Sequence, residues 1–144
     1  MVVDDEVSFA ETLAERLALR KYEVLVSHSG DDAVEKVKRA NIDVVILDVS
    51  MPGMDGIEAL REIKKEKPLT EVIMLTGHAT VESAIEGMKL GALDYLMKPC
   101  ETEDLISKIN TAYDRKKQHE DKIMQARIKE IISSPRSVLK KDKK

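Results

Sequence analysis

Hydrophobic and polar positions along residues 1–115 follow two alternating periods. Short runs of consecutive apolar residues are typical of strands that are buried on both faces of a parallel sheet. Between these runs, apolar residues recur every three or four positions, which is the spacing of amphipathic helices. The runs predict five strands, each followed by a helix, at about residues 1–3, 22–27, 44–48, 71–76 and 94–97.

Several predicted helices carry residues that typically begin or end a helix. Ser29 is the expected N-cap of the second helix and Thr80 that of the fourth, because a hydroxyl oxygen can accept from the free N–H groups of the first turn. Gly91 is expected to close the fourth helix. The apolar stripe of that helix, at i, i+3, i+4 and i+7, consists of Val81, Ala84, Ile85 and Met88.

Strand and helix thus alternate five times, which predicts an α/β fold. This alternation favours a parallel sheet with right-handed crossovers and helices on both faces. The third apolar run, Val44–Leu47, leads directly into Asp48 and then into the turn residues Pro52–Gly53. We therefore expect Asp48 at the carboxyl end of a buried strand, where open α/β sheets place their chemistry.

The last predicted helix is longer than a compact domain needs. It begins near Thr102, and no residue breaks it before Pro135. Roughly 30 residues would then form one helix, whereas the mean helix has about 11–12. We expect the chain to divide into a folded body (1–115), a helical extension (116–134) and a flexible basic tail (135–144). The inner face of the body's last helix carries Leu105, Ile106, Ile109, Ala112 and Tyr113, and the extension carries Ile123, Met124, Ala126, Ile128, Ile131 and Ile132.

Three hypotheses account for this extension: a dimerising coiled coil, an amphipathic helix that binds a partner or inhibits its own domain, and a linker left from a longer protein. The best heptad line passes through Leu105, Ile109 and Ala112 but then places Lys116 and His119 in the middle of the seam. Such polar residues weaken a coiled coil. We still favour a homodimer, because the late Ile/Met stripe needs a surface to cover it.

Composition narrows the function classes. The chain is 42% hydrophobic and 35% charged, as in a globular protein with a heavily charged surface, and only 3% aromatic. Few aromatic residues argue against a stacking platform for single-stranded nucleic acid. The single Cys100 excludes an internal disulfide and suits a reducing compartment. Because no apolar run approaches the ~18–20 residues of a membrane span and no signal peptide is evident, we expect a cytoplasmic protein without membrane contact.

Charge is distributed unevenly along the chain. Residues 1–100 hold 12 Lys/Arg against 19 Asp/Glu, whereas residues 101–144 hold 12 against 8. An acidic body is a poor match for the anionic backbone of DNA, although the basic end alone could touch an anionic surface. Nucleic acid is therefore not an expected partner of the body.

Polar residues follow four of the five predicted strands: Asp4–Asp5, Asp48, Thr76–Gly77 and Lys98–Pro99. In a doubly wound sheet these carboxyl ends line one crevice. Three carboxylates together would repel one another, and a set of carboxylates with water suits Mg²⁺. The lysine, the hydroxyl and a backbone N–H at the glycine would hold an anionic group on the other side. This combination predicts phosphoryl transfer onto Asp48.

Four motifs in this order resemble the receiver domain of bacterial two-component response regulators, over about residues 1–115. They are Val-Val-Asp-Asp-Glu (2–6), Ile-Leu-Asp-Val-Ser-Met-Pro-Gly-Met-Asp-Gly (46–56), Met-Leu-Thr-Gly-His (74–78) and Asp-Tyr-Leu-Met-Lys-Pro (94–99). The segments 76–82 and 98–100 most resemble receivers of the nitrogen-regulator type. Those usually precede an ATPase domain, which this sequence does not show, so we expect a stand-alone receiver. The resemblance implies a flavodoxin-like (βα)5 fold with strand order 2-1-3-4-5.

The resemblance also implies site roles. Asp48 would be the phosphoacceptor and a metal ligand, Asp5 would bind Mg²⁺ directly, and Asp4 would act mostly through water. The backbone carbonyl of Ser50 would complete the protein ligands. Lys98 would pair with the phosphoryl group, aimed by a cis peptide bond before Pro99.

Switching is implied as well. The Thr76 hydroxyl would turn toward the phosphoryl group, beside the N–H of Gly77, and Tyr95 would follow from an outward to an inward rotamer. This change would remodel the surface of the fourth helix, fifth strand and fifth helix, which a downstream protein reads. Ser50 and His78 stand where the family varies and where phosphate lifetime is tuned.

The function expected from these residues is a phospho-accepting switch. A sensor histidine kinase would supply the phosphoryl group to Asp48. The protein would catalyse only its own phosphorylation and dephosphorylation, so it is not expected to be an enzyme with a separate substrate. Two alternatives stay open: the receiver portion of a DNA-binding transcription regulator, and a phosphohydrolase with an aspartate nucleophile.

Overall fold

The structure is a computed structural model that describes residues 1–133. In this range it contains five parallel strands in the order β2-β1-β3-β4-β5, which confirms the predicted topology, and five helices. The strands are β1 (Val2–Val3), β2 (Val26–Ser27), β3 (Val44–Leu47), β4 (Glu71–Thr76) and β5 (Asp94–Met97), and the helices are α1 (Val7–Leu19), α2 (Gly30–Arg39), α3 (Gly56–Glu66), α4 (Val81–Lys89) and α5 (Thr102–Ser133).

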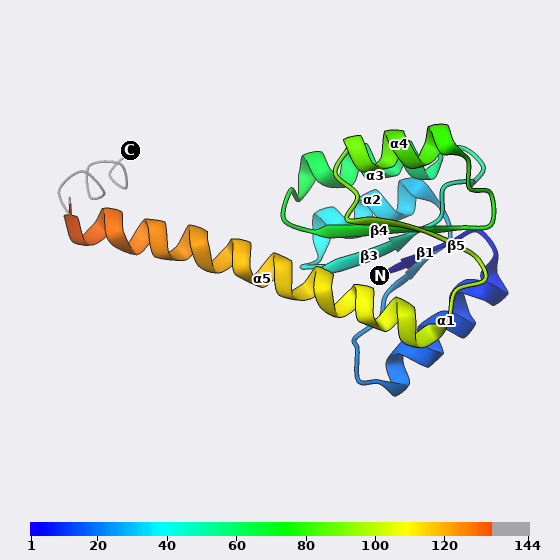
Figure 1. The fold of residues 1–144 in the computed structure, drawn as a ribbon, viewed down its shortest axis with the longest axis horizontal. Coiled ribbons are helices and arrows are strands. Elements are labelled where there is room, and N and C mark those ends of the chain that lie inside the picture. Colours follow the sequence, from blue (N-terminus) through cyan, green and yellow to red (C-terminus); the bar gives the residue numbers. More distant parts are fainter. Residues whose placement is uncertain (134–144) are drawn as a thin grey trace.

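Helices cover both faces of the sheet, with α2, α3 and α4 on one side and α1 with the first part of α5 on the other (Figure 1). Successive strand residues point to opposite faces, so each strand feeds both cores. In β3, Leu47 belongs to the core under α2 and α3, and Ile46 belongs to the core under α1 and α5. All six residues of β4 are buried, which explains their near-continuous apolar run.

The first strand contains only two residues but is paired on both sides. Val3 lies opposite Ser27 of β2 and opposite Leu47 of β3. The Asp4 N–H donates to the Ser27 carbonyl and the Asp48 N–H donates to the Val3 carbonyl, both at 3.0 Å. Because of this register, Asp4 and Asp48 directly follow adjacent strands and lie at the same edge of the sheet.

The predicted caps are confirmed, but the apolar stripe of α4 faces away from the core. Ser29 accepts from the Asp32 N–H, and Thr80 forms a capping box with Ser83. The only buried residue of α4 is Gly87, whereas the stripe residues Val81, Ile85 and Met88 are exposed by 72%, 51% and 47%. A Cβ at Gly87 would meet Ile57, Tyr95 and Met74 at ordinary distances of 3.7–3.8 Å, so α4 faces the domain with the side that carries Gly87, and its stripe lies toward solvent.

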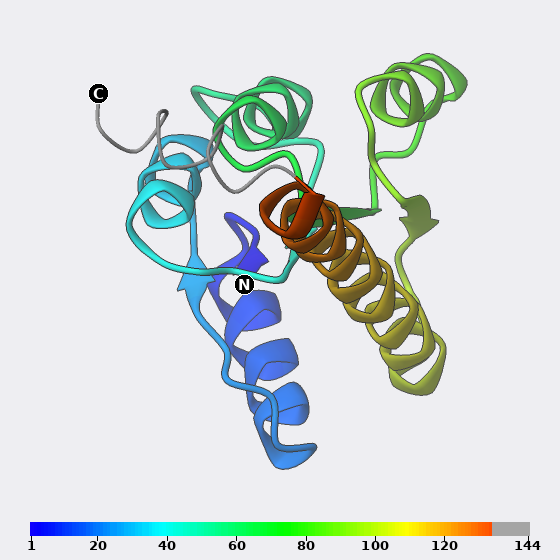
Figure 2. The ribbon, with the colours of Figure 1, turned by 90° about the vertical axis from the view of Figure 1, so that its left-hand side faces the viewer.

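The fifth helix runs without interruption for 32 residues, as predicted, and leaves the domain as an arm (Figures 1 and 2). Leu105, Ile109 and Ala112 are buried as expected, but Tyr113 is 42% exposed and does not belong to the inner face. Lys116 is instead the last buried residue of this face. The placement of Lys116 in a coiled-coil seam is therefore wrong, because this side chain packs against its own domain.

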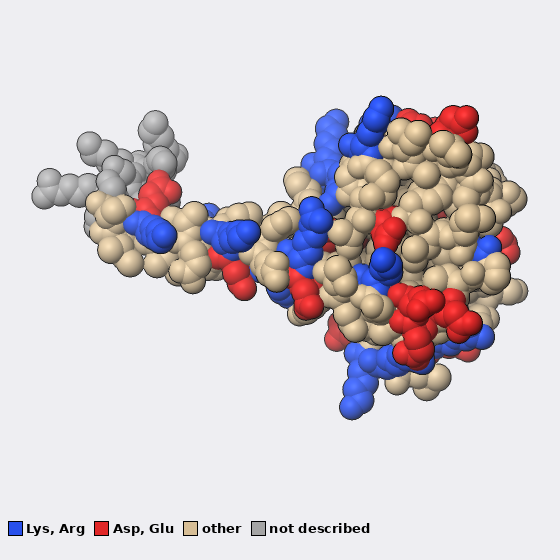
Figure 3. Space-filling model, in the orientation of Figure 1, with Lys and Arg blue, Asp and Glu red and all other residues tan. Residues whose placement is uncertain are grey.

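Beyond Lys116 the arm carries basic and acidic side chains along its length (Figure 3). The expected helix end at Pro135 and the basic tail 135–144 lie outside the described residues. Within residues 1–133, none of the helices has both the length and the apolar character needed to cross a membrane.

Candidate functional site

Asp48 lies directly after β3, and its residue is only 2% exposed. The Ser50 N–H donates to the carboxylate of Asp48 at 3.4 Å, so the chain turns tightly past this group. Gly56 allows the turn, because a Cβ there would lie 2.0 Å from the Asp48 carbonyl oxygen. Burial raises the pKa of Asp48, and the charge of Asp4 adds to this effect, although the Thr76 side chain opposes it. The site thus holds a carboxylate that is costly to keep charged without a cation.

Asp4 and Asp5 follow β1 beside it. One carboxylate oxygen from each of Asp4, Asp5 and Asp48 can be chosen so that all three lie within 4.8 Å of one another. Asp4 is buried, its Oδ1 accepts from the Glu6 N–H at 2.9 Å, and Asp5 is more open to solvent. Three carboxylates at one point form an oxygen donor set of the kind that binds a hard divalent cation.

Lys98 approaches this cluster from the end of β5. The Lys98–Pro99 peptide bond is cis, and the Lys98 N–H donates to the Thr76 carbonyl at 2.9 Å. Its Nζ lies 2.7 Å from Asp4 Oδ2, 3.6 Å from Glu6 Oε1 and 3.9 Å from the centroid of the Phe9 ring. Burial lowers the pKa of Lys98, but the hydrogen bond with Asp4 and the neighbouring carboxylates outweigh it and raise the pKa overall.

Thr76 and Gly77 complete the edge at the end of β4. Thr76 is fully buried, and its hydroxyl oxygen accepts from the His78 N–H at 3.0 Å. A Cβ at Gly77 would meet only Lys98 Cδ, at an ordinary 3.9 Å. The protein itself therefore does not require a glycine at this position, and the predicted approach of its N–H to an anion stays a prediction.

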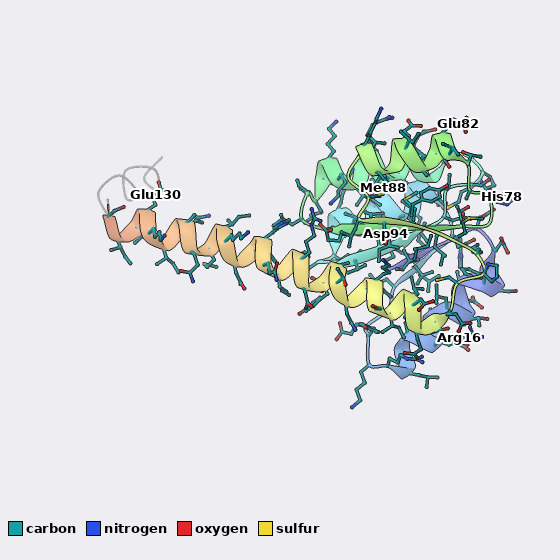
Figure 4. The ribbon with its side chains drawn as sticks, viewed as in Figure 1. Arg16, His78, Glu82, Met88, Asp94 and Glu130 are labelled. Atoms are coloured by element: carbon teal, nitrogen blue, oxygen red, sulfur yellow. The ribbon has the colours of Figure 1, made fainter. Side chains whose placement is uncertain are left out.

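A pocket of about 510 Å³ opens over Asp48. Figure 4 labels His78 at this end of the sheet, on the side away from the arm. An anion that enters here meets the carboxylate of Asp48. The lining residues are Asp5, Glu6, Asp48, Ser50, Met51, Pro52 and His78.

Tyr95 lies on β5, away from the pocket lining. Its ring is half-buried against the core under α2 and α3, and its hydroxyl lies 2.6 Å from the Ser83 hydroxyl in the first turn of α4. The ring also lies 3.7 Å from the position of a Cβ on Gly87. A movement of this ring would therefore act directly on α4.

Three neighbours of the cluster were not singled out from the sequence. Glu6 and Phe9 contact the Lys98 ammonium, and His28 Nδ1 lies 3.0 Å from the Asp4 carbonyl oxygen. In the sequence, Glu6 and Phe9 have nothing that separates them from an ordinary helix start and an ordinary apolar helix position. Only the spacing of Phe9, four residues after Asp5, hints that the first turn of α1 brings it back to the strand ends.

The comparisons with known proteins agree with this geometry. Residues 1–110 match the family model described as response regulator receiver domain. The transcriptional regulatory protein ZraR of Escherichia coli is 40% identical over 112 residues, which is 78% of this chain but 25% of ZraR. The chain thus spans about a quarter of the length of this curated relative.

Two solved structures share the fold. The receiver domain of NtrX from Brucella abortus is 32% identical, with a TM-score of 0.73 over 78% of this chain and 96% of that chain. A response regulator protein from Burkholderia pseudomallei, whose structure contains a phosphorylated aspartic acid, a calcium ion and citrate, is 28% identical. Its TM-score is 0.73 over 83% of this chain and 70% of that chain. Family model, relatives and fold agree, and the chain belongs to the response regulator receiver domain family.

Proposed function

We propose that this protein takes a phosphoryl group from a sensor histidine kinase onto Asp48 and thereby changes a partner-binding surface. The observation that carries the proposal is the meeting of Asp4, Asp5 and Asp48 within 4.8 Å, with Lys98 Nζ 2.7 Å from Asp4. The phosphorylated aspartic acid in the structurally similar Burkholderia protein supports it.

Asp48 is the proposed nucleophile. One of its carboxylate oxygens attacks the phosphorus atom, an O–P bond forms, and the P–N bond to the donor histidine breaks with its electron pair leaving on the imidazole. The Lys98 ammonium, the Thr76 hydroxyl and the Gly77 N–H bind the phosphoryl oxygens. The carboxylate of Asp48 is already fixed by its burial and by the Ser50 N–H, so little reorganisation is needed before attack.

The donor set suits Mg²⁺, because carboxylate and carbonyl oxygens are the ligands that this ion prefers. Asp5 and Asp48 would hold it directly, Asp4 mostly through water, and the Ser50 carbonyl would complete the protein ligands. When bound, the cation neutralises the charge of the carboxylates and of the incoming phosphoryl oxygens. The raised pKa of Asp48 is the expected mark of a carboxylate that needs such a partner.

The output surface is the exposed face of α4, β5 and α5. Thr76 and Tyr95 are the proposed switch residues, and the Tyr95 hydroxyl reaches α4 through Ser83. The exposed apolar residues Val81, Ile85 and Met88 of α4 and Met97 of β5 give a partner something to bind. A downstream protein is the proposed reader of this face in the cytoplasm.

A labelling experiment with a small-molecule phosphodonor tests the function. The wild-type chain is expected to take up one phosphoryl group in the presence of Mg²⁺ and none with EDTA. Asp48→Asn is expected to take up none, whereas the matched control Asp55→Asn, which changes the N-cap of α3 outside the cluster, keeps the label. Labelling of Asp48→Asn at the wild-type rate would reject the assignment.

A second candidate function is the receiver portion of a DNA-binding transcription regulator. The specific observation in its favour is that ZraR is a transcriptional regulatory protein and that this chain covers 25% of it. Salt-dependent binding of duplex DNA by this chain would favour that function. Multiple turnover of a small phosphate ester would instead point to a phosphohydrolase, which we do not propose.

A further inference from the structure

The Lys98 ammonium lies between an acidic side and an aromatic side. Asp4 Oδ2 is 2.7 Å from Nζ and Glu6 Oε1 is 3.6 Å away, while the Phe9 ring faces the same nitrogen with its centroid at 3.9 Å. A cation within about 6 Å of a ring centroid is attracted by the negative face of the ring. The side chain of Lys98 is only 14% exposed, so solvent weakens this attraction little.

Packing alone does not explain an aromatic ring at this position. Phe9 is the first of three apolar residues of α1 that recur every four positions, and Leu13 and Leu17 follow it. All three contact the core under α1 and α5, where Phe9 is partly buried at the edge. A leucine would fill this role, as it does at the next two of these positions. Phe9 is the only phenylalanine of the chain, and a leucine has no π face to offer a cation.

We propose that Phe9 is a positioning residue for Lys98, and this inference rests on the proposed function. The ring confines the ammonium beside the cluster before a phosphoryl group arrives, so that less side-chain freedom is lost during the reaction. Asp4 and Asp48 have carboxylate oxygens within 4.8 Å of each other. The ammonium therefore moves only a short way from Asp4 to a phosphoryl group on Asp48 and stays over the ring.

The functional test is a double-mutant cycle on the rate of Mg²⁺-dependent labelling by a small-molecule phosphodonor. Phe9→Leu is expected to slow labelling about two- to fivefold, the effect of a partly shielded cation–π contact. Phe9→Tyr keeps the ring and is expected to stay within about twofold of wild type. In a Lys98→Ala background, Phe9→Leu is expected to add nothing, because the cation is gone.

A change in packing would behave differently. Leu13→Val loosens the same core without touching Lys98 and is expected to lower the free energy of unfolding while leaving the labelling rate unchanged. A Phe9→Leu variant that labels at the wild-type rate overturns the proposal. A Phe9→Leu effect of equal size with and without Lys98 also overturns it.

A second measurement reads the contact without any phosphoryl group. In the NMR spectrum of the wild-type chain, the ring current of Phe9 is expected to shift the ε-methylene protons of Lys98 upfield, and Phe9→Leu is expected to abolish the shift. Absence of the shift in the wild type overturns the proposal. If the shift is present but the chain takes up no phosphoryl group, the proposed function fails, and with it the role of Phe9, although the contact itself stands.

Discussion

The Tyr95 hydroxyl lies 2.6 Å from the Ser83 hydroxyl, and this contact ties the edge strand β5 to the first turn of α4. Ser83 also completes the capping box with Thr80, so the same side chain serves the helix start and the tyrosine. Because Gly87 is the only buried residue of α4, few other side chains hold this helix to the domain. The position of the Tyr95 ring is thus linked to a helix that has a single buried residue.

Tyr95→Phe removes this hydrogen bond and keeps the ring. We expect the free energy of unfolding to fall by about 1 kcal/mol, the usual net value of a neutral hydrogen bond. Amide hydrogen exchange in α4 should become several-fold faster while exchange in the buried strand β4 stays unchanged. Tyr113→Phe on the exposed side of α5 is the control. Equal exchange in α4 before and after the Tyr95 change would contradict the linkage.

The raised pKa of Asp48 has a consequence for stability in the absence of metal. Burial is the main cause of the shift, so the native state binds a proton more tightly than the unfolded state, whose carboxyl keeps the ordinary value of 3.8. The free energy of unfolding therefore falls as the pH rises from 3.8 through the native pKa. At neutral pH the charged Asp48 destabilises the metal-free protein.

We therefore expect Asp48→Asn to raise the midpoint of thermal unfolding in EDTA at neutral pH. The gain should shrink toward zero below pH 3.8, where the wild-type carboxyl is protonated in both states. Calorimetry across the pH range measures both effects. A variant less stable than wild type at neutral pH would show that hydrogen bonds to the charged carboxylate outweigh its desolvation.

Added Mg²⁺ should make the wild-type chain more stable than Asp48→Asn, because the ion binds to and stabilises the native wild-type chain. A ligand at 100 times its Kd stabilises the native state by about 2.7 kcal/mol. Asp5→Asn removes a donor that is open to solvent, so the stabilisation at the same Mg²⁺ concentration should nearly vanish. Glu82→Gln, on α4, changes no carboxylate of the cluster and should keep it. Equal Mg²⁺ stabilisation in Asp5→Asn and wild type would remove Asp5 from the ligand set.

The sequence predicted where strands occur because buried parallel strands have a strong apolar signature, although the strand expected at 22–27 is paired only at Val26–Ser27. The order of the strands was implied by the family resemblance. The end of β3 at Leu47 and the position of Asp48 follow from four apolar residues and a turn. The meeting of Asp4 and Asp48 also follows, since their strands are neighbours in the sheet. The partner of Lys98 could not be predicted, because the bond from Nζ to Asp4 depends on how a flexible side chain lies among several carboxylates.

Helix faces were harder to predict than helix positions. The stripe of Val81, Ile85 and Met88 has the spacing of a core face but points outward, because α4 faces the domain with the side that carries Gly87. Spacing also cannot distinguish a lysine in a solvent-exposed seam from one whose ammonium bonds to acceptors on its own domain, as Lys116 does. The contact of Phe9 with Lys98 joins α1 to β5, and no local pattern in either segment reports it.

Lys116 fixes the point where α5 leaves the domain. Its side chain is 5% exposed, and its Nζ donates to Asp43 Oδ1 at 2.7 Å and to Asn41 Oδ1 at 3.1 Å. Lys116→Met keeps the stem but leaves both acceptors without this donor. Because the Asp43 side chain is 35% exposed and water can replace part of the bond, we expect a loss of about 1–2 kcal/mol in urea unfolding.

The matched control for this change is Lys117→Met on the next residue. The Lys117 side chain is 44% exposed, and its ion pair with Glu120 spans 3.4 Å within the same helix. The free energy of unfolding should stay close to that of the wild type, because an exposed side chain contributes little. Equal losses for both variants would mean that Lys116 acts only through helix propensity.

The exposed apolar residues of the arm predict self-association. Met124, Ile128 and Ile131 recur at i, i+4 and i+7, and they are exposed by 59%, 40% and 48%. This spacing is the one that a coiled-coil seam requires. We therefore expect the full chain to sediment as a dimer at micromolar concentration and Ile128→Glu to sediment as a monomer, because facing glutamates would repel in the seam. Lys122→Glu, on the opposite side of the helix, should stay dimeric, and a monomeric wild-type chain would leave the arm to bind a different partner.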